Sequence, residues 1–123
     1  MSSREWIFRM GDILRAIEKI EQYTSRMTLI KFKKNDLIID AVIRNFEILG
    51  EASKSIPLSV QRSYPQIPWK EMKGMRDILI HQYFGVDTKI LWHTLKKQLP
   101  SLKSQLKNLL QDFDKHRLST SKK

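Results

Sequence analysis

The chain has 123 residues, a length that suits one domain with a core of its own. It has no cysteine, which excludes disulfides and thiolate metal sites and fits a reducing cytoplasm. The N-terminus MSSREWIFRMGD has no apolar signal core, and no apolar run approaches the roughly 20 residues of a membrane span. We therefore expect a soluble, cytoplasmic chain that is not a membrane protein.

The positive charge is concentrated in the last third of the chain. The net charge is +10, from 23 Lys/Arg and 13 Asp/Glu. Residues 1–87 carry 14 Lys/Arg and 11 Asp/Glu, a net of +3, whereas residues 88–123 carry nine and two, a net of +7. No acid occurs from 88 to 111. The pattern predicts an anionic partner such as nucleic acid, an acidic protein or a membrane surface, or else a solvated lysine-rich face.

Apolar residues recur at helical spacing through the first half of the chain. They predict a long first helix over 5–23 and a second over 35–53, joined by a connector with a short helical turn at 28–33. The first stripe consists of Ile7, Met10, Ile13, Leu14, Ile17 and Ile20. The second consists of Ile38, Ala41, Val42, Phe46, Leu49 and Ala52. No segment alternates as a strand does, so both patterns indicate an all-helical protein.

Prolines divide the next section. One short helix fits between Pro57 and Pro65. Pro68 suits the first turn of another helix, where its missing N–H costs nothing, and that helix is predicted to reach Phe84. Gly85 then stands where a helix commonly ends.

The last section is predicted to contain two helices and a tail. Asp87 is placed as the N-cap of a helix over 88–98, and Pro100 predicts a break or kink. A last helix should continue to about Phe113, followed by a basic, disordered tail over 115–123. The predicted fold is an all-α, largely antiparallel bundle of about five main helices, with one domain over 1–114.

The stretch MRDILIHQYFGVD, residues 75–87, places four polar groups in an apolar helix. Asp77 and His81 are four apart and share a face, so the carboxylate can orient the imidazole. Arg76 and His81 are five apart, about 140° around the axis with about 7.5 Å of rise. They can meet around a ligand in a cleft, or where two copies of the helix cross. Gly74 would let a second backbone approach, although a helical glycine also has ordinary explanations.

The chemistry available to these side chains is narrow. Arginine forks onto phosphate oxygens, and a histidine can take a proton from a hydroxyl and return one to a leaving group. This suffices for RNA cleavage without a metal. The histidines His81, His93 and His116 are far apart and form no metal-binding motif, so we expect no cofactor. Alternatively, the arginine and the histidine are structural residues or simply exposed surface residues. Taken alone, Tyr83 is typical of an aromatic residue that packs in the core or at its rim.

The segment RDILIHQY, residues 76–83, resembles the R-x4-H-x-Y motif of HepT-like toxins of the HEPN superfamily. Residues 40–56 and 64–106 resemble the second long helix and the central segment of that family, so the resemblance covers most of residues 5–110. It implies a HEPN helical bundle and a homodimer in which the motif helices of both chains line one RNA-binding cleft. Arg76 and His81 would then act with their symmetry mates.

The resemblance also implies a function. The chain would be the toxin of a type II/VII-like toxin–antitoxin system, a metal-independent endoribonuclease. A nucleotidyltransferase antitoxin of the MntA kind would silence it by transferring AMP onto the motif tyrosine. The alternative is a catalytically weak HEPN module that docks the nucleotidyltransferase and accepts AMP. A basic helical DNA-binding protein has only the net charge in its favour.

The family roles carry over to residues of this chain. Arg76 would bind the scissile phosphate, His81 would be the general acid/base, and Tyr83 would be the site of AMP transfer. The family often has Asn after the arginine, whereas this chain has Asp77, which can support His81 or repel phosphate. The basic stretch predicts RNA-backbone contacts at Lys89, Lys96 and Lys97.

Overall fold

The computed structural model describes the backbone of residues 5–81 and 87–121, and the side chains of residues 5–75 and 87–114. The helices are α1 (Glu5–Thr24), α2 (Leu29–Lys33), α3 (Asp36–Lys54), α4 (Leu58–Ser63), α5 (Trp69–His81), α6 (Thr88–His93), a π-helical turn (Thr94–Gln98) and α7 (Leu99–Ser121). These described residues form no strand. The predicted all-α class is therefore confirmed.

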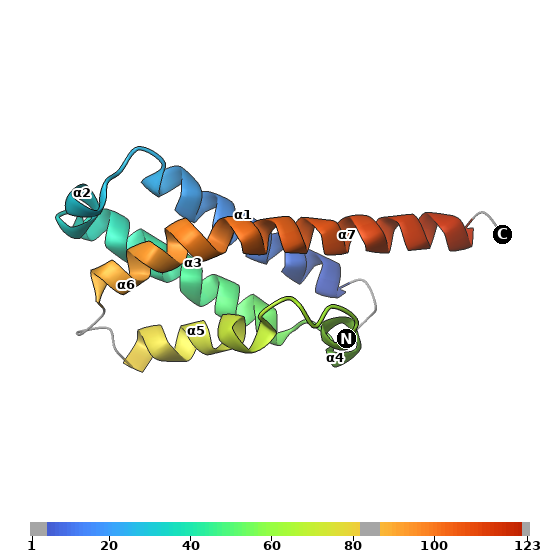
Figure 1. Cartoon of the computed structure of the whole chain (residues 1–123). Helices are drawn as coiled ribbons and strands as arrows, with labels where there is room; N and C mark the ends of the chain where they lie inside the picture. Colours follow the sequence, from blue (N-terminus) through green and yellow to red (C-terminus); the bar gives the residue numbers. More distant parts are fainter. Residues whose placement is uncertain (1–4, 82–86, 122–123) are drawn as a thin grey trace.

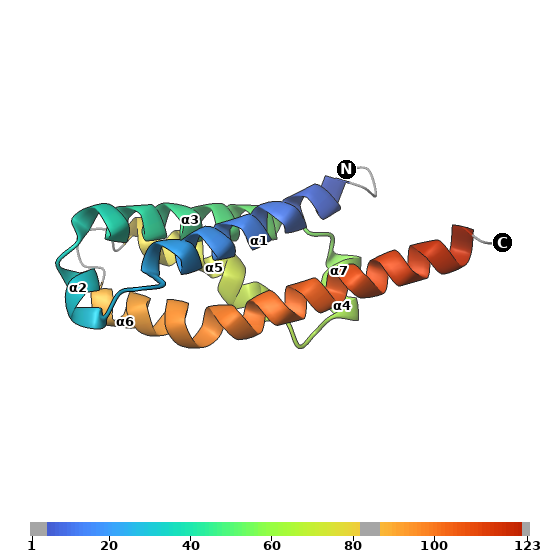
Figure 2. The same cartoon turned by 90° about the horizontal axis from the view of Figure 1, so that it is seen from above.

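The long helices form an antiparallel bundle (Figures 1 and 2). Helix α3 packs against α1 on one side and α5 on the other, and α7 packs against α1. Helix α6, the π turn and α7 form one long rod beside them (Figure 2). The short helix α2 contacts α3 and α6 at one end of the bundle. No helix in the described part of the chain is long and apolar enough to cross a membrane.

Side-chain caps explain where three helices begin. The Thr28 hydroxyl accepts from the Lys31 amide at 3.3 Å, and the side-chain oxygen Oδ1 of Asn35 accepts from the Ile38 amide at 3.0 Å. These bonds satisfy amides that lack an intrahelical partner. Asp87 does the same for α6, accepting from the Lys89 amide at 2.9 Å. The predicted starts of the second long helix and of α6 are confirmed.

The predicted apolar stripes form the core. On α1, Met10, Ile13, Ile17 and Ile20 are fully buried, and on α3 so are Val42, Phe46 and Leu49. Ile7 and Leu14, which the first stripe also included, are half-buried against this cluster. Trp6 and Phe113 meet edge to face with ring centroids 4.9 Å apart, which fastens the start of α1 to α7.

Polar contacts join α7 to the rest of the bundle. The Lys103 ammonium donates to Glu21 of α1 at 2.9 Å, and this hydrogen bond raises the pKa of Lys103. Gln105 donates to the carbonyl of Gln66 in the loop before α5, at 3.4 Å. Burial raises the pKa of Tyr64 in the same loop, and the carboxylate of Asp112 adds to the effect. The loop that leads into α5 is thus held against α7.

Pro100 distorts the rod without breaking it. A proline inside a helix removes one hydrogen bond and clashes with the carbonyl four residues before it. Here the turn just before Pro100 widens into a π-helical turn, in which the Leu99 amide donates to the carbonyl of Thr94, five residues back. The helical path then continues into α7. The predicted irregularity at Pro100 is therefore a local widening of a continuous rod.

The last helix is longer than the sequence predicts. Its backbone remains helical to Ser121, so the expected end near Phe113 is wrong. Residues 114–121 contain neither glycine nor proline, and a helix that is already anchored adds further residues at little cost. Figures 1 and 2 show this part of α7 extending past the other helices. The side chains from 115 onward lie outside the described set, so disorder of the tail stays a prediction.

Candidate functional site

Helix α5 carries the motif and is fixed at its start. The Met72 amide donates to the carbonyl of Pro68 at 3.0 Å, so Pro68 closes the first turn as the sequence predicts. The indole N–H of Trp69 donates to the carbonyl of Tyr64 at 3.0 Å. Trp69 and Met72 are both buried. The first turn of α5 is therefore anchored to the loop before it and to the core.

The backbone places the motif residues on one helix. Arg76, Asp77 and His81 all lie within α5, so the predicted helical placement of these three residues is confirmed. Asp77 and His81 share a face, whereas Arg76 and His81 diverge by about 140°. Their side chains lie outside the described residues, and so do Tyr83 and Gly85 altogether. The roles given to Arg76, Asp77, His81 and Tyr83 therefore stay predictions.

Gly74 precedes the motif arginine and is not required by the packing of the described chain. A Cβ atom added there would meet no described atom within 4 Å. Glycine in a helix interior costs about 1 kcal/mol relative to alanine. Nothing within the described residues offsets that cost, which fits a contact made with another molecule.

Helix α3, the neighbour of α5, contributes structural polar groups. Asn45 is buried, and its side-chain amide donates to the carbonyl of Ala41 at 2.9 Å. Ser53 is fully buried and donates to the carbonyl of Leu49 at 2.6 Å. Each side chain donates a hydrogen bond to a backbone carbonyl of its own helix, so it can be buried in the core.

The three lysines predicted to contact RNA have different surroundings. The ammonium of Lys96 donates to the carbonyl of Thr24 at 3.1 Å and lies 4.8 Å from the centroid of the Trp92 ring. Lys96 therefore holds the rod to the last turn of α1. Lys89 and Lys97 are exposed and have no side-chain hydrogen bond or ion pair with any described residue. Their ammonium groups are the better placed of the three to bind phosphate.

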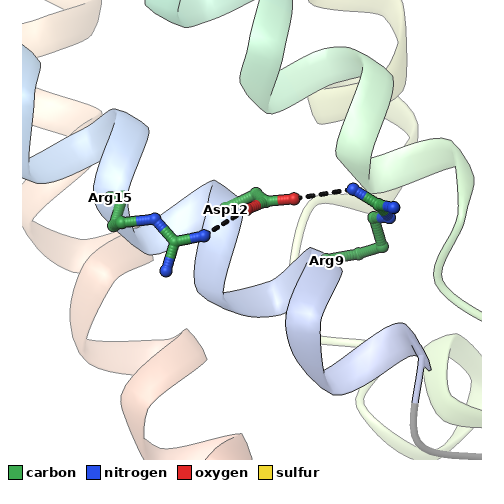
Figure 3. A network of polar contacts seen from close by, with 3 residues as sticks. All are labelled: Arg9, Asp12 and Arg15. Carbon is green, nitrogen blue, oxygen red and sulfur yellow. Dashed lines mark hydrogen bonds and ion pairs between the residues drawn. The ribbon is translucent and has the colours of Figure 1, made fainter.

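A further polar cluster, on α1, has no counterpart in the sequence predictions. Asp12 pairs with Arg9 at 2.9 Å and also with Arg15 (Figure 3). The R-x2-D-x2-R spacing was the available signal, because residues three apart on a helix are neighbours. Such spacing is common on exposed helices, so the sequence alone gave no reason to single it out.

Comparison with known proteins identifies relatives along most of the chain. The sequence profile of the family described as "Ribonuclease HepT-like" matches residues 13–109. The chain is 50% identical over 100 residues to "Probable ribonuclease HepT" of Thermococcus cleftensis, a match that covers 81% of this chain and 91% of that protein. No solved structure is significantly similar.

A longer relative occurs in Methanocaldococcus jannaschii. It is named "Gamma-glutamylcyclotransferase and putative RNase MJ0434" and is 44% identical over 108 residues. The match covers 88% of this chain but 49% of that protein, so the chain spans about half of this relative's length.

Substitutions of Lys96 and Lys97, the two neighbouring lysines of the π turn, test whether the first stabilises the bundle and the second binds RNA. Lys97→Gln should weaken RNA binding equally across sequences and reduce the slope of log K against log salt by about one, because one phosphate contact is lost. Its free energy of unfolding should stay within about 0.5 kcal/mol of the wild-type value. Lys96→Gln should instead cost about 1–2 kcal/mol of folding stability, because it loses the carbonyl bond and the indole contact.

Titrations at several salt concentrations and thermal unfolding measure both effects. A Lys97→Gln protein with altered sequence preference and an unchanged salt slope would contradict the proposed backbone contact. An equally stable Lys96→Gln protein would show that the contacts of Lys96 do not stabilise the bundle.

Proposed function

The chain belongs to the HepT-like ribonuclease family, and we propose that it is a metal-independent endoribonuclease that acts as a toxin. The observation that carries this proposal is the placement of Arg76 and His81 on α5, at the spacing of the family motif and inside the matched residues 13–109. The net charge of +7 over 88–123, from nine basic and two acidic residues, favours a polyanionic substrate.

The proposed reaction uses the 2′-hydroxyl of RNA as nucleophile. The 2′-oxygen attacks the adjacent phosphorus, and the bond from phosphorus to the 5′-oxygen breaks. His81 is assigned the removal of the 2′ proton and, with its symmetry mate, the donation of a proton to the departing 5′-oxygen. Arg76 is assigned to the phosphate oxygens, where its fixed charge stabilises the negative charge that develops. The products are a 2′,3′-cyclic phosphate and a 5′-hydroxyl.

We further propose that the active form is a two-fold dimer. The divergence of Arg76 and His81 around α5 makes one helix poorly suited to place both groups on one phosphate. A second α5 crossing near Gly74 supplies the complementary group from the other chain. Gly74 supports this arrangement, since the described residues of its own chain give no reason for a glycine there.

Silencing by a partner enzyme completes the proposal. A nucleotidyltransferase antitoxin transfers AMP from ATP to Tyr83: the phenol oxygen attacks the α-phosphorus, pyrophosphate leaves, and the phenol proton passes to a base of that enzyme. The adduct adds a negatively charged phosphodiester seven residues after Arg76, a separation of about two helical turns. Its phosphate then competes with RNA for the same guanidinium.

The second candidate is a binding module with little catalytic power. It is favoured by Asp77, because a carboxylate directly after Arg76 can repel the scissile phosphate. In this case the chain docks the nucleotidyltransferase and accepts AMP without cleaving RNA. Incubation of the purified protein with total RNA in EDTA separates the two candidates.

His81→Ala should abolish RNA cleavage while the helical content is kept. Loss of a general acid/base is expected to lower the rate by about 10²–10⁴-fold. His93→Ala is the matched control, because His93 is exposed on α6 and should leave the rate unchanged. Cleavage in EDTA, followed by analysis of the RNA ends, gives the readout. Wild-type cleavage by His81→Ala protein would refute the catalytic assignment.

Gly74→Leu should convert the dimer to a monomer. A Cβ atom there meets no described atom of its own chain within 4 Å, so the monomer should keep its helical circular dichroism, whereas a second α5 would be kept at a distance. Ser59→Leu, which adds the same side chain to an exposed site on α4, should stay dimeric. Light scattering at micromolar concentration measures both. A monomeric wild-type protein, or a dimeric Gly74→Leu protein, would refute the proposed crossing.

Tyr83→Phe should keep substantial ribonuclease activity but escape silencing by the partner and ATP. The phenyl ring preserves the shape of the side chain and removes the oxygen that accepts AMP. Tyr23→Phe is the control, because Tyr23 of α1 is another tyrosine with an exposed side chain and its substitution should leave modification unaffected. Intact-mass measurement after co-expression with the partner decides the matter. An AMP-sized increase on Tyr83→Phe protein, or none on wild type, would refute this role.

A further inference from the structure

The outer face of α1 carries an aromatic ring that the core does not use. Phe8 is 71% exposed, although its neighbour Trp6 is 4% exposed and packs on Phe113. On a helix, residues 8, 12 and 15 lie within about 60° of one another, so Asp12 and Arg15 follow Phe8 along one face. The exposed ring therefore stands in line with a cluster of charges.

That cluster holds two guanidinium groups in place. Arg9 and Arg15 both donate to the carboxylate of Asp12, one from each side (Figure 3). The Asp12 side chain is 28% exposed, whereas those of Arg9 and Arg15 are 52% and 66% exposed. The carboxylate is therefore the least exposed member of the cluster. Each guanidinium has five N–H donors, so donors remain for an outside ligand, and the three groups together carry one net positive charge.

Gly11 makes room for this arrangement. A Cβ atom at position 11 would lie 3.3 Å from Nη1 of Arg15, which is tighter than ordinary contact. The guanidinium of Arg15 therefore lies beside the bare backbone at Gly11, one turn before the Cα atom of Arg15.

We propose that Phe8, Arg9 and Arg15 form an accessory site for single-stranded RNA. A base stacks on the ring of Phe8, and the guanidinium of Arg15 binds the phosphate next to that base. Exposed aromatic rings beside cations are the elements with which proteins hold single strands without reading sequence. Lys19, exposed one turn further along the same face, extends the track, while Glu18 borders it on one side. The inference rests on the proposed ribonuclease function, because it concerns the same substrate.

The site is separate from the motif. Helices α1 and α5 pack on different sides of α3 (Figure 1). The accessory site therefore holds a part of the RNA away from the scissile phosphate, and its loss should weaken the binding of long single strands. A duplex hides the faces of its bases, so the phenyl ring should add nothing to the binding of double-stranded RNA.

The test uses the His81→Ala background, so that binding is measured without cleavage. Phe8→Ala should weaken the binding of a single-stranded 20-mer by about 5- to 150-fold, the range for one stacked base, and leave binding of a 20-base-pair duplex unchanged. Arg15→Gln should reduce the salt slope by about one. Leu37→Ala and Arg62→Gln are the controls, because both alter exposed side chains elsewhere and should match the background protein.

Three results would overturn the inference while leaving the ribonuclease proposal intact. Phe8→Ala and Arg15→Gln proteins that bind single strands as well as the controls do would exclude the accessory site. Equal weakening for single and double strands would exclude stacking on Phe8. A change of oligomeric state in Phe8→Ala protein would show that a second copy covers the ring. By contrast, failure of the background protein to bind any RNA would overturn the ribonuclease proposal itself.

Discussion

The arrangement of the bundle depends on α3, which is buried along two sides. A helix that packs on one neighbour needs a single apolar stripe, whereas α3 lies between α1 and α5 and needs a broader buried surface. Its fully buried members on the apolar side are Val42, Phe46 and Leu49. Polar residues also enter this surface, and Asn45 and Ser53 do so by bonding to their own helix. The position of α5, and with it the backbone of the motif, follows from this packing.

The rod of α6 and α7 shows how one element combines packing and charge. The turn before Pro100 is widened, but the rod stays continuous. Leucines on one side of the rod are therefore buried, and lysines on the other side exposed, both before and after Pro100. The absence of acids from 88 to 111 leaves the exposed side with charge of one sign. Lys96 and Lys103 bind to α1 through Thr24 and Glu21. Exposed positions such as Lys97 are the ones that remain for a polyanion.

Sequence reasoning was accurate where local chemistry decides the structure. The start of the helix after Asn35, the cap at Asp87 and the core stripes follow from side chains within one turn of each other. The π turn did not follow, because widening a turn or breaking the helix at Pro100 is decided by the packing on both sides of the proline. The same holds for Lys96, whose partner Thr24 is 72 residues away in the sequence. Contacts of this kind depend on the assembled bundle.

The proposed function assigns RNA binding and RNA cleavage to different helices, and this separation has a physical basis. Interactions between exposed charges fade over about 8–10 Å at physiological ionic strength, so the lysines of the rod and the arginines of α1 are expected to act only on the part of the proposed RNA substrate that lies next to them. Chemistry at the scissile phosphate requires groups in direct contact with it, and α5 is where the motif places such groups. On the proposed function, substrate affinity and bond cleavage should therefore be separable by substitution. If the proposed assignments hold, substitutions at Lys97 or Arg15 should change how RNA is held, whereas substitution of His81 should change whether it is cut.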